Sequence, residues 1–121
     1  MIDKYVQILN GLMERTDKGD LDWTETANKS AFLVSFPNYS IIFSEEQSQS
    51  GDLPDYLISI KNSEGRTVDS FSDVDLLSAE PGRKYFETMR DFFNKVRRKA
   101  LRVDEALDDI LSHLGERSKR S

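Results

Sequence analysis

The chain contains no cysteine, and other residue types that usually carry chemistry are scarce. Without cysteine, the 121 residues can form no disulfide, no thiolate zinc site and no cysteine nucleophile. His113 is the only histidine, so a metal site or a general base would lack its usual partners. The six glycines form no phosphate-binding loop. We therefore expect a protein that is not an enzyme and that uses no metal and no cofactor; a hydrolase using carboxylates alone is the remaining enzymatic alternative.

No hydrophobic run in the sequence reaches the length of about 20 residues that crosses a membrane. The start of the chain lacks a signal-peptide pattern, which favours a cytoplasmic location and no membrane contact. With 37% hydrophobic and 32% charged residues, the composition is that of a soluble globular domain. We expect one domain over residues 1–115 and a frayed, charged tail over residues 116–121.

The charge is unevenly distributed along this acidic chain, whose net charge is -5. Residues 1–82 carry 15 acidic and 6 basic side chains, whereas residues 83–102 carry 8 basic and 2 acidic ones. Net acidity argues against nucleic-acid binding, because phosphate contacts need a basic face. The basic segment is expected either to stay solvated or paired within its own chain, or to contact a partner.

Two apolar series have helical spacing. The first predicts a helix over residues 2–16, with Gly19 beyond its end and with a helix-weakening Gly11 inside it. The second alternates spacings of three and four residues, which predicts one long helix, or two helices with a kink near Arg102, stopping at Gly115. The residues of this second series are Phe86, Met89, Phe93, Val96, Ala100, Val103, Leu107, Ile110 and Leu114.

Between the two helical regions the apolar residues alternate, as they do in half-buried strands. This pattern predicts four or five short strands, a polar loop over residues 45–54 and an acidic connector over residues 73–80. The fold expected is α+β: an N-terminal helix, an antiparallel meander sheet of four or five strands, and a long or kinked C-terminal helix packed on one face. The strands are expected at residues 22–26, 31–36, 39–43, 56–60 and 66–71.

Five stretches carry a family resemblance: Leu12–Thr16, Gly19–Trp23, Ser35–Ser40, Gly65–Ser70 and Arg97–Leu111. With these stretches the chain resembles small single-domain bacterial proteins of an uncharacterised family with no assigned activity. The resemblance implies a prokaryotic, cytoplasmic, single-domain protein. It supplies no catalytic residue.

The function expected from these residues is that of a non-enzymatic, acidic protein-binding module of the immunity, inhibitor or adaptor type. Trp23 either anchors a partner or belongs to the core, since aromatic residues dominate interface hot spots. An apolar series exposed in a monomer would be a large patch, so a homodimer through the C-terminal helix is also expected as an option. The candidate partner-binding residues are Trp23, Arg90, Lys95, Arg97, Arg98 and Arg102.

The alternative function is a small-molecule or nucleotide sensor with a pocket between the sheet and the C-terminal helix. In this hypothesis Arg90 or Arg97 would hold an anionic ligand. The aromatic residues expected to line the pocket are Tyr39, Phe43, Tyr56 and Phe93.

Overall fold

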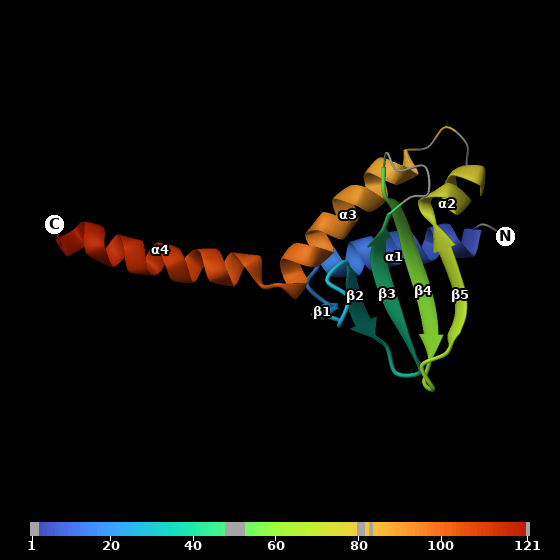
Figure 1. Ribbon diagram of the computed structural model, residues 1–121, viewed down its shortest axis with the longest axis horizontal. Helices are drawn as coiled ribbons and strands as arrows, with labels where there is room; N and C mark the ends of the chain where they lie inside the picture. The colour runs from blue at the N-terminus through green and yellow to red at the C-terminus, as the bar shows by residue number, and fades with distance from the viewer. Residues whose placement is uncertain (1–2, 48–52, 80–81, 83, 121) are drawn as a thin grey trace.

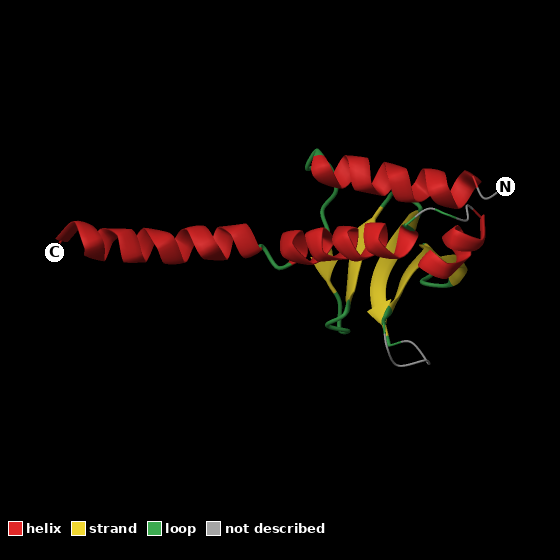
Figure 2. Cartoon of the chain, turned by 90° about the horizontal axis from the view of Figure 1, so that it is seen from above, coloured by secondary structure: helices red, strands yellow, loops and turns green. Residues whose placement is uncertain are grey.

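The computed structural model describes residues 3–47, 53–79, 82 and 84–120. Its strands follow one another in the order β1-β2-β3-β4-β5, and every neighbouring pair is antiparallel. Helices α1 and α3 lie on the same face of this sheet, and α4 projects away from it (Figures 1 and 2). The predicted α+β meander is therefore confirmed. The strands are β1 (Thr24–Glu25), β2 (Ala31–Ser35), β3 (Tyr39–Glu46), β4 (Asp55–Asn62) and β5 (Thr67–Ser72).

Helix α1 (Asp3–Asp17) matches the first apolar series and lays its apolar side on the sheet. Leu9 and Leu12 are buried in the core. The helix ends at Asp17, and Gly19 in the turn that follows has a φ of 79°, a left-handed conformation that costs glycine little.

Alternation along the strands decides which side chains face the helices. One inward row crosses four strands, pairing Phe32 with Phe43, Phe43 with Ile58, and Ile58 with Phe71. All four residues are buried. Tyr5 of α1 stacks on Phe71 with ring centroids 4.5 Å apart, which fixes α1 against the far end of this row.

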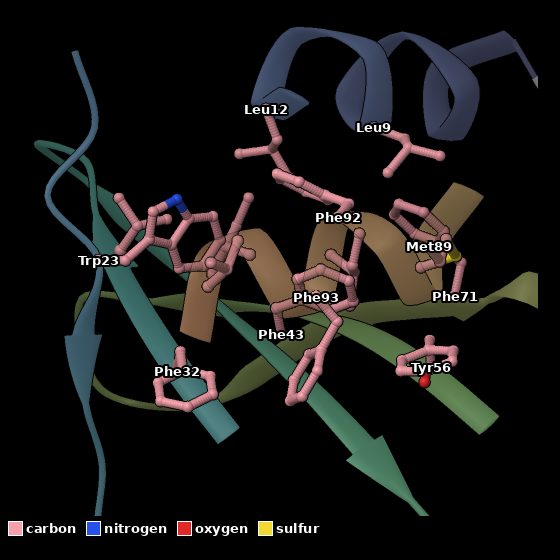
Figure 3. Packing of buried hydrophobic residues seen from close by; sticks show 14 of the residues in the cluster. Leu9, Leu12, Trp23, Phe32, Phe43, Tyr56, Phe71, Met89, Phe92 and Phe93 are labelled. Carbon is pink, nitrogen blue, oxygen red and sulfur yellow. The ribbon is translucent and has the colours of Figure 1, made fainter. Parts of the chain in front are cut away.

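Phe43 lies at the centre of the hydrophobic core, which Figure 3 shows from close by. Its ring centroid lies 5.2 Å from that of Phe92 and 5.3 Å from that of Phe93, both on α3. The rings of Trp23 and Tyr56 lie 6.4 and 6.5 Å away. These edge and tilted contacts join the sheet to α3 in one aromatic cluster.

The acidic connector expected over residues 73–80 is instead helical from Asp73 to Ala79, and this segment is α2. Its start is capped reciprocally: the Asp75 backbone N–H donates to the Ser72 hydroxyl, and the Ser72 backbone N–H donates to the Asp75 carboxylate. Leu76 is fully buried, which holds α2 against the body. The prediction of a simple connector was wrong because it overlooked this capping pattern.

The second apolar series forms two helices, as the kinked alternative predicted. Helix α3 (Tyr85–Ala100) is capped by Leu101. Arg102 then takes a left-handed φ of 54°, and α4 (Val103–Arg120) follows. Helix α4 continues through Gly115, so the expected stop at that glycine was wrong. Of the predicted loop over residues 45–54, residues 48–52 lie outside the described residues, and Glu45 and Glu46 belong to β3.

Only the first half of the series packs on the sheet. Met89 and Val96 of α3 are fully buried, whereas Leu107 and Ile110 of α4 are 48% and 54% exposed. The second half therefore does not cover the sheet of its own chain, and Figure 1 shows α4 extending beyond the body.

Candidate functional site

Several of the predicted partner-binding residues meet in one cleft. Lys95, Arg98 and Arg102 line it together with Trp23, and its volume is about 660 Å³. We call this the α3–α4 cleft, because it lies between the end of α1, the chain before β1 and the junction of α3 with α4. Lys95 and Arg98 lie three residues apart and therefore share a face of α3, and Arg102 follows in the turn between α3 and α4.

Three cations of the α3–α4 cleft, Lys95, Arg98 and Arg102, are paired with carboxylates of the same chain. Lys95 donates to Asp17, and the Arg98 Nη2 atom lies 2.9 Å from Asp104 Oδ1. The cleft is lined by four basic and five acidic side chains in all. Because these pairs are exposed, each contributes about 0–1 kcal/mol of stability, and the cleft presents no net positive charge to an anion.

Trp23 belongs to the core. Its side chain is 3% exposed, and its indole N–H donates to the buried Thr16 hydroxyl over 2.9 Å. Its ring packs edge-on against Phe92 at 6.2 Å. The core alternative therefore holds, and the role of a partner anchor is corrected, because almost none of the indole reaches solvent.

Arg90 and Arg97 do not line the α3–α4 cleft. The Arg90 guanidinium lies 5.8 Å from the centroid of the Phe86 ring, and its Nε atom lies 3.2 Å from Asp91 Oδ1. Arg97 is exposed on α3. Of the six residues predicted to bind a partner, Arg90 and Arg97 therefore lie apart from the other four.

The pocket expected for a sensor is filled by its own aromatic side chains. Phe43, Tyr56 and Phe93 are buried, with centroids 5.3 to 6.5 Å apart. Tyr39, the fourth residue expected in that pocket, is 51% exposed near the β2–β3 turn. These three buried residues pack against one another at the interface between sheet and α3, and they line neither the α3–α4 cleft nor the groove between α1 and the strands.

Tyr56 makes the fold sensitive to high pH. Burial, and donation of its hydroxyl to Glu45 Oε2 over 2.8 Å, raise the pKa of Tyr56 above its usual value of about 10. The neutral phenol therefore stabilises the fold fully below pH 10, and this contribution is lost as the pH rises further.

We expect the difference in unfolding free energy between wild type and Tyr56→Phe to shrink by up to about 1.4 kcal/mol per pH unit above 10. Urea unfolding at pH 8 and at pH 11 measures it. A difference that is the same at both pH values would contradict this role of Tyr56.

Helix α4 carries an exposed apolar surface, and none of the residues predicted to bind a partner belongs to it. Leu107, Ile110 and Leu111 are 48%, 54% and 63% exposed. We call these three residues the apolar α4 face. Apolar side chains clustered on one exposed helix face usually mark an interaction site. The heptad spacing predicted the cluster, but not that it would face solvent.

A second apolar surface lies between α1 and the strands. It is a groove of about 460 Å³, bordered on α1 by Ile8, Gly11 and Arg15, and on the sheet by Phe36 and Tyr39. We call it the α1 groove. The sequence did not predict this groove, because its residues come from α1 and from the sheet, which are distant in the sequence. The only sign of it in the sequence was the unfavourable Gly11 inside α1.

None of the His, Asp and Glu side chains of the described residues gather in a group of three or more that could hold a metal ion. No helix in the described ranges is long and apolar enough to span a membrane. His113 is exposed on α4, where its Nδ1 lies 2.8 Å from the Asp109 carbonyl oxygen.

Comparison with protein-family models, with curated proteins and with solved structures found no match to this chain.

Proposed function

We propose that the protein is a non-enzymatic protein-binding module of the immunity, inhibitor or adaptor type, and that α4 is its binding element. The observation that carries this proposal is the exposure of the apolar α4 face on a helix that projects from the body (Figure 2). Amphipathic helices commonly bind by laying such a face into an apolar groove of a partner.

The charges around this face support a protein partner. The first two turns of α4 carry Asp104, Glu105, Asp108 and Asp109, and residues 103–114 contain no lysine or arginine. Negative charge beside an apolar face steers the helix toward a partner surface that is apolar and rimmed by cations.

The bacterial, cytoplasmic setting of this proposal rests on the sequence resemblance and on composition. Homodimerisation through the C-terminal helix belongs to the same proposal, since a second copy is one protein that α4 could bind. The sensor alternative gains no support from the structure, because the aromatic residues expected to bind a ligand fill the core instead.

A capture experiment tests the binding role of α4. The tagged full chain is incubated with a bacterial lysate at low and moderate salt, and stoichiometric binding is quantified against the double variant Leu107→Glu, Ile110→Glu. We expect the double variant to lose at least about tenfold in affinity, because two carboxylates would replace apolar contacts at the interface. Self-association, measured by sedimentation, serves as the readout if the partner is a second copy.

Ser112→Glu is the matched control, since it adds a carboxylate to the same helix at an exposed position outside the apolar face. It should bind as the wild type does. Unchanged binding by the double variant would remove α4 from the interface, and equal losses in both variants would show that the apolar α4 face is not the part of α4 that binds.

A further inference from the structure

The α1 groove is an apolar surface with little charge. Its walls are α1 on one side and, on the other, the turn after β2 and the adjoining ends of β3 and β4; Phe36 and Tyr39 on its rim are 37% and 51% exposed. Among the residues that line it, Arg15 is the only charged one. A helix with an apolar face and acidic flanks is the complementary partner for such a groove.

The same chain supplies such a helix. We propose that the α1 groove accepts α4 of a second copy of this chain, so that two copies exchange their C-terminal helices. This inference rests on the proposed function, because it names the partner that the apolar α4 face binds. Reciprocal exchange closes the assembly as a two-fold dimer.

The dimensions of helix and groove agree. Residues of α1 from Gln7 to Arg15 border the groove, which is about 12 Å along the helix axis at 1.5 Å per residue. The apolar α4 face, from Leu107 to Leu111, spans about 6 Å on the same scale. The face therefore fits within the groove, with room for the neighbouring turns of α4.

The groove of the same chain is out of reach for α4. Helix α4 leaves the body at Arg102 and runs away from it, as both views show (Figures 1 and 2). A second copy has no such constraint.

Charge favours the groove over a pair of α4 helices. Residues 103–114 carry four carboxylates and no lysine or arginine, so two copies of this segment laid side by side would bring like charges together. In the groove the same carboxylates meet Arg15, which is held only by an exposed ion pair with Asp20 at 3.6 Å. Exposed pairs of this kind are weak and exchange partners readily.

Gly11 is the residue that leaves the groove open. Glycine inside a helix is unfavourable, and the chain gains no internal packing from this one, since a Cβ at Gly11 would meet no atom within 4 Å. The missing side chain leaves space on the α1 wall of the groove. A partner helix can approach the α1 backbone closely there.

The variant Gly11→Glu separates binding from folding. It fills the groove and sets a carboxylate against the acidic flanks of α4, but it improves helix propensity and places a carboxylate four residues before Arg15. We expect its melting temperature to be unchanged or higher at a concentration where the chain is monomeric. We expect the dimer to dissociate at least about tenfold more readily than the wild type. Gly11→Ala, which adds one methyl group, is the matched control and should remain dimeric.

Sedimentation of the full chain at about 10 and about 100 µM provides the readout. The expected results are a wild-type mass of twice 13.9 kDa and a single-chain mass for both Gly11→Glu and the double variant Leu107→Glu, Ile110→Glu. A wild type that stays monomeric at the higher concentration overturns the inference, and so does a Gly11→Glu chain that remains dimeric.

These outcomes distinguish the two proposals. If the double variant dissociates but Gly11→Glu does not, α4 binds elsewhere on a second copy, and only the groove is wrong. If the wild type is monomeric, the groove inference fails, and the capture experiment alone decides whether α4 binds another protein. If both variants remain dimeric, the dimer forms without α4, and the groove inference fails again.

Discussion

Replacing Phe43 by alanine is expected to lower the free energy of unfolding by about 3–5 kcal/mol, as measured by urea denaturation. Its side chain is fully buried, and its ring contacts the rings of Phe92 and Phe93 of α3 at centroid distances of 5.2 and 5.3 Å. The loss combines the transfer of the ring from water with a cavity that the surrounding rings cannot fill. The sheet and α3 would lose their main common contact.

Leu111→Ala is the matched control for this prediction, because it also truncates a large apolar side chain, but one that is 63% exposed. It should change the unfolding free energy by less than about 0.5 kcal/mol at a concentration where the chain is monomeric. Similar losses in the two variants would show that Phe43 is not at the centre of the core.

The second large effect is expected for Val96→Asp, which should lower the free energy of unfolding by more than about 4 kcal/mol. Val96 is fully buried on the face of α3 that covers the sheet. An aspartate there would carry an unpaired charge into the core, or bind a proton and leave a buried carboxyl unsatisfied. Far-UV circular dichroism and urea unfolding at neutral pH measure the loss; a variant as stable as the wild type would place α3 outside the core.

Much of the fold could be predicted because periodicity is a local property of the sequence. The alternation of Phe32 and Val34, and of Ile41 and Phe43, fixed the inward face of the strands before any contact was known. Helix α2 was missed because its seven residues are too few to show a periodic pattern. The sequence feature that indicates α2 is the pair Ser72 and Asp75, which cap the start of the helix reciprocally. The acidic character of residues 73–80 had suggested only a connector.

The fate of the second apolar series could not be predicted from its spacing. Val96 and Ile110 occupy equivalent positions two heptads apart, yet one is fully buried and the other is 54% exposed. Spacing states which side chains share a helix face, but it does not state what covers that face. The left-handed Arg102 decides the difference, and a non-glycine residue in that conformation leaves little trace in the sequence.

The candidate site was predictable only where it lies on one helix. Lys95, Arg98 and Arg102 converge because they follow one another along α3 and the turn after it. The burial of Trp23 depends on Thr16 and Phe92, which come from different parts of the chain. The α1 groove likewise needs α1, the β2–β3 turn and strands β3 and β4 in place, so no local pattern could reveal it.

The division of one apolar series into a core half and a binding half is tested most directly by Ile110→Asp. The variant places the same substitution as Val96→Asp at the equivalent heptad position of α4. Measured by urea unfolding at a concentration where the chain is monomeric, its free energy of unfolding should stay within about 0.5 kcal/mol of wild type, while capture or self-association falls at least about tenfold. A loss of stability comparable to that of Val96→Asp would contradict the account, because it would show that α4 belongs to the core of its own chain.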